Sequence, residues 1–508
     1  MSTVDIVDTE VLIAGAGPTG LVLAIDLARR GIPHRIVDRS ARGFPGSRGA
    51  GIQPRTLEVL DDLGVVDALL AGSGPVPPVQ TWRGTERGER WNLTESAGDS
   101  PAIPYPEPRM LPQWRTVEIL VARLEELGGH VGFRTELTGF SQDPDGVTAT
   151  LRHADGTAET VRAKWLVAAD GGRSTVRKAL GVPFTGEQLE PYPALIADVL
   201  LDGPDRAEID PDHWHMWQKA EGGLVALRPL EQVETVQLIA GFEADRELDI
   251  ARDAAPGALT ALLTERTGLR LKVNEVTWAS AYRPRMAMAE RFRSGRVLLA
   301  GDAAHVHSPA GGQGLNTSLQ DAYNLGWKLG AVLRLGAPEA LLDSYDAERS
   351  RVAADVLSLS SRVHRADRTD PDGRWRRGPE THQLTLGYRE SALSRELRRD
   401  VPDDVLRAGD RAPDAPCLDA AGLPVRLFDV FRGPHFTLLA VTDGELAGEL
   451  AGEFAPWVRT FRPVDAEGHV KRAYGTGLFL IRPDGYVGLA TDDPSDVSAY
   501  LRDVTGQG

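Results

Sequence analysis

The stretch VLIAGAGPTGLVLAIDLARR, residues 11–30, decides the first part of the fold. Its apolar run 11–14 predicts a buried strand, and the apolar residues after Gly20 recur at helical spacing. Gly15, Gly17 and Gly20 predict a tight turn that offers a ligand backbone N–H groups and the positive end of a helix dipole. Such a turn is typical of a pyrophosphate site in a dinucleotide-binding fold, although an ordinary strand-to-helix turn can carry the same glycines.

An acidic residue, Asp38, ends the next predicted strand. It follows Gly20 by 18 residues, close to the spacing at which dinucleotide-binding folds place a carboxylate on a ribose. Beyond it lies a basic, glycine-rich loop, residues 39–55, in which small residues flank Arg48. We expect Arg48 to bind a phosphate or a ribose rather than to face solvent, and we expect Arg55 to be structural.

A third apolar run, residues 164–169, leads into Asp170 and Gly171, and Ser174 then opens a short helix. Residues at the carboxyl end of a parallel strand lie at the edge where open α/β sheets bind ligands. A helix cap followed by a turn explains the same residues equally well, so both interpretations stay open.

The most specific segment of the chain follows the apolar run 296–300. Gly301 and Asp302 come first, then the glycine-rich segment 309–316, and then a predicted helix over 315–335. The unpaired N–H groups at the start of this helix, together with its dipole, suit negative charge that develops on a bound ring system.

Between these segments the pattern becomes β-rich, from residue 181 to residue 285. Residues 71–108, rich in Pro, Gly and Trp, predict an excursion into the same region. Four alternating runs predict strands of one antiparallel sheet: residues 194–200, 213–218, 223–228 and 236–242.

Two pairs of histidines raise the question of a metal site. His213 and His215 lie two residues apart, so on a strand they share a face with Trp217. No Asp, Glu or Cys nearby completes a convincing ligand set, so we expect packing or pocket lining and no metal. The same argument applies to His305 and His307.

The composition limits the class of protein. A chain of 508 residues predicts two to four domains, and a formal net charge of −16 argues against nucleic acid or an anionic membrane as partners. The single cysteine, Cys417, excludes a disulfide within the chain and a redox pair of thiols, which fits a reducing compartment. The sequence has no signal peptide and no apolar stretch that could span a membrane, so we expect a cytoplasmic protein.

Taken together, the glycines of the first turn, Asp170 with Gly171, and Gly301 with Asp302 resemble the motifs of the class A flavoprotein monooxygenases in their order. This is the family of p-hydroxybenzoate hydroxylase and phenol hydroxylase. The resemblance covers residues 8–365, and the chain is most similar to the aromatic polyketide hydroxylases and the pentachlorophenol-type monooxygenases. The tail from residue 410 resembles the thioredoxin-like domain that ends phenol hydroxylase and its polyketide relatives.

The resemblance implies an α/β fold in three parts. Residues 1–180 and 280–395 form a discontinuous, Rossmann-like FAD-binding domain in this interpretation. Residues 181–279 form an inserted β-rich substrate domain, to which residues 72–108 contribute. Residues 400–508 form the thioredoxin-like domain, which we expect to serve packing or oligomerisation, for example in a homodimer, because the chain has no second thiol.

The resemblance also implies FAD as a non-covalent cofactor and NADPH or NADH as a co-substrate that binds transiently at a surface cleft. The first turn would contact the pyrophosphate, and Asp38 the adenosine ribose. Gln113 and Asp302 would bind the ribityl and phosphate region, and Asp170 would serve both FAD and the nicotinamide cofactor. The cofactor-binding residues that we expect are Gly15, Gly17, Pro18, Thr19, Gly20, Asp38, Arg39, Arg48, Gln113, Asp170, Gly171, Gly301, Asp302, Pro309, Gly312, Gly314, Leu315 and Asn316.

The activity implied by the resemblance is hydroxylation of a phenolic or polyketide-type aromatic substrate, as in antibiotic biosynthesis. NAD(P)H reduces FAD, dioxygen adds at C4a of the flavin, and the hydroperoxide transfers its distal oxygen to the ring. The substrate would lie between the flavin and the sheet of residues 181–285. A general base for the phenol is optional, and His215 and Tyr282 are its candidates.

Two alternatives stay open. Baeyer–Villiger oxygenation of a polycyclic ketone uses the same cofactor chemistry, and a protein that binds flavin without turnover would keep the same fold. A flavin-dependent halogenase is disfavoured because the segment Trp214-His-Met-Trp217 lacks the spacing of the Trp-x-Trp-x-Ile-Pro motif. A flavoprotein disulfide reductase is excluded by the single cysteine.

Overall fold

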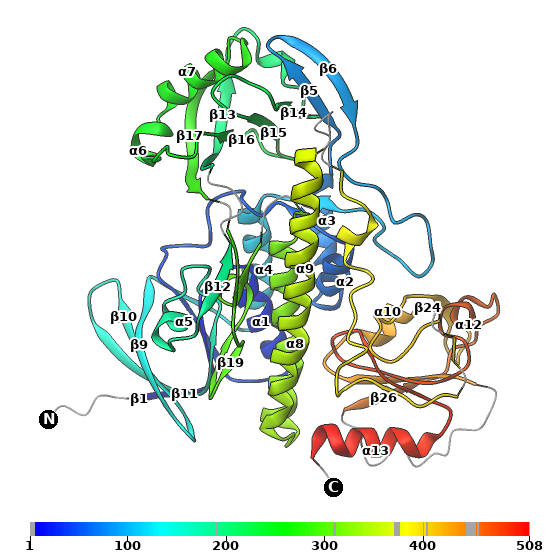
Figure 1. The fold of residues 1–508 in the computed structure, drawn as a ribbon. Coiled ribbons are helices and arrows are strands. Elements are labelled where there is room, and N and C mark those ends of the chain that lie inside the picture. Colours follow the sequence, from blue (N-terminus) through cyan, green and yellow to red (C-terminus); the bar gives the residue numbers. More distant parts are fainter. Residues whose placement is uncertain are drawn as a thin grey trace, which may run out of the picture.

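The computed structural model describes residues 6–187, 192–283, 285–307, 311–369, 376–399, 401–402, 405–442, 454 and 457–506. Three large sheets organise these residues, and the long helices α8 (Gly314–Arg334) and α9 (Asp343–Thr369) run between them (Figure 1). The fold is therefore mixed α/β, as the sequence predicts. Within the described ranges, no helix has the length and apolar character needed to cross a lipid bilayer.

The first sheet carries the N-terminal strand at its centre. Its parallel strands, in spatial order, are β20 (Val297–Leu299), β11 (Ala158–Ala168), β1 (Ile6–Ala14), β2 (His34–Asp38) and β8 (Val131–Phe133). Residues 11–13 are fully buried, which explains why β1 is an unbroken apolar run. Because these strands end at one edge, that edge collects Gly15, Asp38, Asp170 and Gly301.

This part of the fold also contains helices. They include α1 (Pro18–Arg29), α2 (Pro54–Asp62) and α4 (Gln113–Glu126). Residues 164–168 of the predicted apolar run form the second half of the longer strand β11. The first half of β11 pairs with β10 (Gly146–His153) and its last three residues pair with β20. Helix α9 continues to Thr369, beyond residue 365, where the resemblance to the family ends.

The second sheet is the β-rich region, and its four predicted strands are confirmed. The order is β17 (Lys272–Tyr282), β13 (Ala194–Asp202), β16 (Val236–Gly241), β15 (Val225–Pro229), β14 (Trp214–Trp217), β5 (Val79–Arg83) and β6 (Glu86–Trp91). The sheet is not wholly antiparallel, because β14 and β5 pair in parallel. Strands β5 and β6 come from the predicted excursion.

The two faces of the second sheet have different neighbours. Leu195, Leu227 and Leu238 are fully buried in one cluster with Leu259 and Leu263 of α7 (Pro256–Thr267). Alternation along the strands turns the residues between them to the other face. That face is turned toward the first sheet and the end of α9 (Figure 1).

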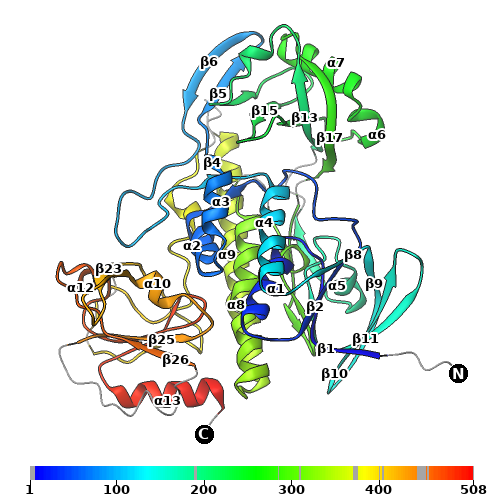
Figure 2. The ribbon, with the colours of Figure 1, turned by 180° about the vertical axis from the view of Figure 1, so that it is seen from behind.

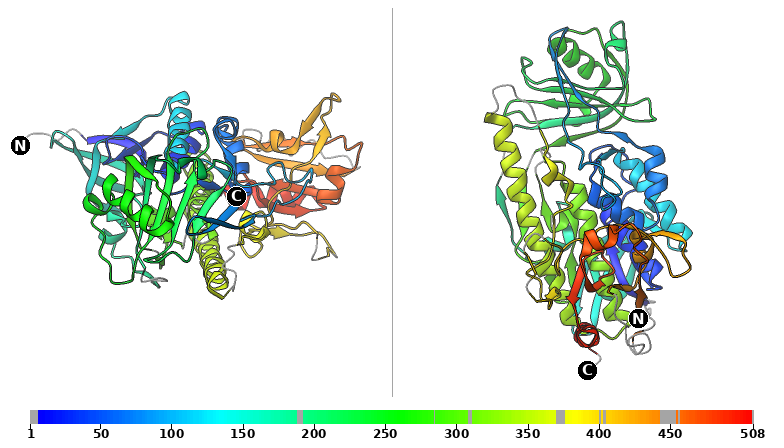
Figure 3. Two further views of the ribbon diagram at one scale, coloured as in Figure 1. Left: turned by 90° about the horizontal axis from the view of Figure 1, so that it is seen from above. Right: turned by 90° about the vertical axis from the view of Figure 1, so that its right-hand side faces the viewer.

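The C-terminal sheet has the order β22 (Arg395–Glu396), β28 (Val487–Thr491), β27 (Gly477–Ile481), β25 (Phe436–Val441) and β26 (Val458–Phe461). Helix α13 (Pro494–Thr505) lies along it. Trp327 of α8 packs edge-on against Phe436, with 5.6 Å between the ring centroids. Figures 2 and 3 show this part beside α2 and α8, away from the second sheet.

Candidate functional site

Two glycines of the first turn are required by packing inside the protein. A Cβ atom on Gly15 would lie 2.3 Å from the carbonyl oxygen of Ala169, and one on Gly20 would lie 2.0 Å from the carbonyl oxygen of Gly15. Gly15 also has a φ of 107°, which favours glycine. These glycines let β1, β11 and α1 approach one another, whatever binds beside them.

Gly17 differs, because a Cβ atom on it would have no atom within 4 Å. It precedes α1 with an ordinary extended backbone (φ −72°, ψ 177°), and no side chain caps the helix. Its missing side chain leaves space in front of the N–H groups of α1, where a phosphate binds favourably. Pro18 opens the helix, and Thr19 Oγ1 lies 2.6 Å from the position that a Cβ on Gly301 would take.

Asp38 fastens the first turn to β2. Its Oδ2 accepts a hydrogen bond from the Ala16 N–H (2.8 Å), and its Oδ1 accepts one from the Ser40 N–H (2.8 Å). A carboxylate has further lone pairs for ribose hydroxyls, and Asp38 is only partly buried. Arg39, the next residue, is exposed.

Asp170 combines both roles that the sequence leaves open. Its Oδ2 caps α5 (Thr175–Ala179) by accepting from the N–H groups of Thr175 (2.8 Å) and Val176 (3.2 Å). Its Oδ1 is buried without a hydrogen-bond partner among the described residues. Because such an oxygen is unfavourable without a donor, it fits a bound ligand. A Cβ on Gly171 would meet no atom within 4 Å, so space lies beside it.

A buried ionic cluster holds the turn of Gly301 in place. Asp321 of α8 accepts from the Gly301 N–H (3.0 Å), from His305 Nε2 (2.6 Å) and from Arg349 Nε (2.7 Å). Burial alone would raise the pKa of Asp321, but His305 and Arg349 hold it below its ordinary value. Asp302, in contrast, keeps exposed surface although the protein around it raises the pKa of its carboxyl.

The start of α8 borders the same edge. A Cβ on Gly314 would have no atom within 4 Å, and no side chain caps the helix. Asn316, which the sequence predicts as a cofactor ligand, is fully buried and uses its amide within the protein. Its Oδ1 accepts from the Gln53 N–H (2.8 Å), and its Nδ2 donates to the carbonyl oxygen of Gly312 (3.0 Å). Pro309 lies outside the described residues.

Gln113 holds the loop that carries Arg48, and Leu315 lies beside that loop. Gln113 Oε1 accepts a hydrogen bond from the Gly49 N–H (2.9 Å). A Cβ on Gly49 would lie 3.6 Å from the Cβ of Leu315. Gln113, predicted as a cofactor ligand, therefore also anchors the loop.

Arg48 reaches from the first part of the fold to the second sheet. Its Nη2 donates to Ser280 Oγ (2.6 Å), and its guanidinium lies 5.5 Å from the ring centroid of Tyr282. Its charge also lowers the pKa of Asp302, against the larger effect of burial. Arg48 and Tyr282 thus lie together at the junction of the two sheets, and Tyr282 stays a candidate base.

His215, the other candidate base, uses both ring nitrogens within the protein. It is fully buried, and Trp82 Nε1 donates to its Nδ1 (3.0 Å). The proton therefore sits on Nε2, which donates to the carbonyl oxygen of Asp210 (3.0 Å). Burial also lowers the pKa of His215. With both nitrogens engaged, His215 packs the second sheet.

The structure adds a polar row that the sequence analysis missed. Asp198, Gln237 and Arg228 are cross-strand neighbours on β13, β16 and β15, on the face opposite α7. The Ser47 N–H donates to Asp198 Oδ2 (3.0 Å), and Gln237 Nε2 donates to the Ser47 carbonyl oxygen (2.8 Å). The guanidinium of Arg228 lies 5.0 Å from the ring centroid of Trp214. The row docks the Arg48 loop on the second sheet.

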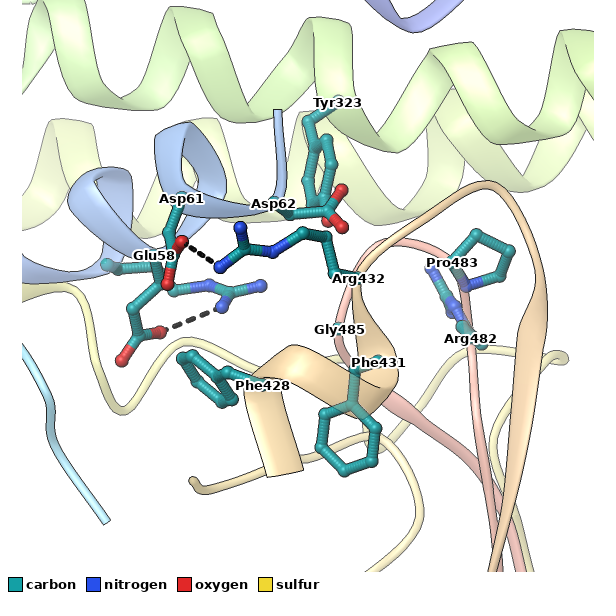
Figure 4. Close-up of a pocket in the computed structure, with 11 residues that line it drawn as sticks. Glu58, Asp61, Asp62, Tyr323, Phe428, Phe431, Arg432, Arg482, Pro483 and Gly485 are labelled. Carbon is teal, nitrogen blue, oxygen red and sulfur yellow. Dashed lines mark hydrogen bonds and ion pairs between the residues drawn. The ribbon is translucent and has the colours of Figure 1, made fainter. Parts of the chain in front are cut away.

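The C-terminal part joins the rest of the chain through buried ion pairs. Arg482 Nη1 donates to Glu348 Oε1 of α9 (2.7 Å), and its Nε donates to Asp484 Oδ1 (3.0 Å). Figure 4 shows the adjoining pocket, in which Arg432 from the C-terminal part points at Asp61 of α2. Arg432 Nη2 lies 2.5 Å from Asp61 Oδ1. Charge pairing, rather than an open ligand site, characterises this interface.

Cys417 gives this part no evident thiol chemistry. It is a free cysteine, and burial together with nearby carboxylates raises its pKa to about 11. A thiol with such a pKa stays protonated near neutral pH and is a poor nucleophile. The described residues also contain no group of three or more His, Cys, Asp or Glu side chains arranged to hold a metal ion.

Comparison with known proteins gives consistent matches. The FAD binding domain family matches residues 8–360, and the C-terminal domain family of aromatic-ring hydroxylases matches residues 406–508. A flavin-dependent monooxygenase of Mycobacteroides abscessus is 44% identical over 500 residues, which cover 97% of this chain and 99% of that protein. The 12-dehydrotetracycline 5-monooxygenase/anhydrotetracycline 6-monooxygenase of Streptomyces rimosus is 35% identical over 94% of each chain. The crystal structure of aklavinone-11 hydroxylase with FAD and aklavinone matches with a TM-score of 0.83 and 30% identity, over 99% of this chain and 100% of that one.

Proposed function

The chain belongs to the FAD-dependent aromatic-ring hydroxylases, and from this premise we propose that it inserts one oxygen atom into a phenolic, polyketide-type aromatic substrate. The observation that carries the proposal is the open edge of the first sheet. There Gly17, Gly171 and Gly314 leave space, and Asp170 keeps an unpaired oxygen. The polar face of the second sheet lies opposite this edge.

The residues at this edge fit FAD. The N–H groups of the Gly17 turn suit the pyrophosphate, Asp38 suits the ribose, and Asp302 follows Gly301 at the same edge. Bound there, FAD supplies the redox chemistry, since it accepts electrons from NADPH or NADH and activates dioxygen for transfer of one oxygen atom. The dipole and free N–H groups of α8 stabilise negative charge beside Gly314.

The remaining tasks belong to the chain's own residues. Binding between the two sheets would orient the aromatic ring and exclude water from the reacting atoms. The guanidinium of Arg48 lies over the ring of Tyr282 at this junction, and its positive charge would stabilise a phenolate bound nearby. We assign Tyr282 as the candidate that would accept the phenol proton.

We also propose a role for each domain of the chain. Residues 1–180 and 280–395 hold FAD, and residues 181–279 with 72–108 hold the substrate. Residues 400–508 form a thioredoxin-like domain with a packing role. The ion pairs between Arg482, Glu348 and Asp484 support that packing role.

The test is purification of the full chain and a spectrum for bound flavin, followed by NADPH and NADH oxidation with and without a panel of phenolic polyketides. We expect oxidation that the substrate stimulates and a product with one added oxygen. The connectivity of the product separates ring hydroxylation from Baeyer–Villiger oxygenation. Bound flavin without stimulated oxidation across the panel would overturn the proposed activity on those substrates.

A pair of variants tests the cofactor edge separately. Gly17→Val places a side chain where no protein atom stands, so we expect a folded protein that loses its FAD. Gly257→Val makes the same change on the exposed start of α7, also with open space around it, and should keep FAD. Equal FAD content in both variants would contradict the assignment of the Gly17 turn.

A further inference from the structure

Arg228 is a buried arginine without an ionic partner. Only 7% of its surface is exposed, and its Nε has no hydrogen-bond partner among the described residues. Its one hydrogen bond among the described residues runs from Nη2 to Gln237 Oε1 (2.5 Å), and no described carboxylate lies within 4.0 Å of it. Arginine is rarely buried unless it is paired, because an uncompensated charge loses its hydration. Some other group must compensate this charge when the enzyme works.

The surroundings of Arg228 are rich in donors. Trp214, whose ring lies under the guanidinium, is 5% exposed, and its Nε1 also lacks an acceptor in the described structure. A second cation, Arg377, lies near enough to lower the pKa of Arg228, although burial has the larger effect. Unsatisfied donors and a like charge in one place call for a ligand with negatively charged oxygen.

Arg228 also lies beside the cofactor edge. Arg377 Nη1 is 2.8 Å from the position that a Cβ on Gly312 would take, just before the start of α8. Arg228 is therefore located between the second sheet and the α8 turn, where the proposed function places the substrate. A group bound to Arg228 would belong to the substrate rather than to a distant site.

The acid in the polar row does not neutralise Arg228 directly. Asp198 accepts from the Ser47 N–H and hydroxyl, and Gln237 stands between it and Arg228. Gln237 donates from Nε2 to the Ser47 carbonyl oxygen and accepts at Oε1 from Arg228 Nη2. These two hydrogen bonds fix the orientation of its amide. This holds the guanidinium in place without a contact between opposite charges.

We propose that Arg228 selects substrates that carry an ionised oxygen group, a carboxylate or an enolate, and that Trp214 donates a second hydrogen bond to it. This inference rests on the proposed function and adds the class of substrate. It makes Arg228 a specificity-determining residue, with no part in the oxygen transfer.

The experiment uses the FAD-loaded full chain and matched aromatic ligands: an acid, its methyl ester, and a ketone with and without an enolisable position. We expect the wild type to bind the ionised member of one pair about 100-fold more tightly in calorimetry. A difference between the acid and its ester would identify a carboxylate as the recognised group, and a difference between the two ketones would identify an enolate. Arg228→Met should reduce that ratio to near one, mainly through KM, and Arg228→Lys should keep part of it.

Arg270→Met is the matched control, because this arginine is 70% exposed on the same domain and pairs with Asp205. It should keep the wild-type ratio. Equal binding of ionised and neutral ligands by the wild type would overturn the inference, as would an unchanged ratio in both Arg228 variants. Calorimetry decides this even without turnover, whereas failure of the proposed function appears as absent NAD(P)H oxidation.

Discussion

Two buried arginines of this protein have opposite surroundings. Arg482 is fully buried at the C-terminal interface, where it pairs with Glu348 and Asp484. Lys328 completes that cluster by donating to Glu348 (2.7 Å), so two cations meet two anions. Arg228, buried almost as deeply, has one amide oxygen and no carboxylate within ion-pair distance in the described structure.

This difference indicates a different role for each of the two arginines. A buried ion pair keeps its members compensated at all times, so the Arg482 cluster can hold two parts of the fold together without a ligand. A buried charge with unsatisfied donors is compensated only when something binds. We therefore interpret the first arginine as structural and the second as a recognition group.

The largest effect is expected from Arg482→Met. It leaves Glu348 and Asp484 buried with fewer cations, so we expect the free energy of unfolding to fall by about 3–5 kcal/mol. Urea unfolding of the FAD-loaded protein measures this change. Arg270→Met is again the control and should be nearly neutral. A similar small loss in both variants would show that the cluster does not secure the C-terminal part.

The second largest effect is expected from acid, which should weaken the Arg482 cluster. Burial alone would raise the pKa of Glu348, but Arg482 and Lys328 hold it well below its ordinary value of 4.5. A group with a lowered folded-state pKa contributes its stability in full above its unfolded pKa and loses it as the pH falls below that value. We expect Tm to fall as the pH drops from about 5 toward 3. Glu348→Gln should flatten this dependence, and an unchanged slope would contradict it.

A smaller effect is expected from Ser47→Ala, which probes the polar row beside Arg228. The variant removes the hydroxyl that bonds Asp198 and Gln237, leaving a buried carboxylate with one donor fewer. We expect a loss of about 1–2 kcal/mol in urea unfolding. The pKa of Asp198, already raised by burial, should rise further. A stability equal to that of the wild type would mean that the row does not anchor the Arg48 loop.

The sequence predicted the parts of the site that depend on local geometry. The turn at Gly15 and Gly20 needs glycine for close backbone contacts within one βα unit, and such a requirement is visible in the sequence. The strand ends before Asp170 and Gly301 were predicted because each follows a short apolar run in the local sequence. The family resemblance implied Asn316 as a ligand. That its amide also accepts from the Gln53 N–H, 263 residues away, was not visible in the local sequence.

The misses share a physical cause, which is burial by distant segments. The bond from Trp82 to His215 spans 133 residues, so the sequence alone left both packing and pocket lining open for His215. Arg228 ends an apolar strand run, a position that usually faces solvent. It is buried here because Ser47 joins Gln237 across 190 residues. A charge or amide inside an otherwise apolar run, as at Arg228 and Gln237, is the signal that could have identified the row.

The smallest expected change tests the central claim most directly. The measurement compares the free energy of unfolding of Arg228→Met, without substrate, with that of Arg482→Met. Losing an unpaired buried charge offsets the lost hydrogen bond to Gln237, so we predict stability within about 1 kcal/mol of the wild type. A loss for Arg228→Met as large as that for Arg482→Met would contradict the account, because Arg228 would then be a structural residue like Arg482.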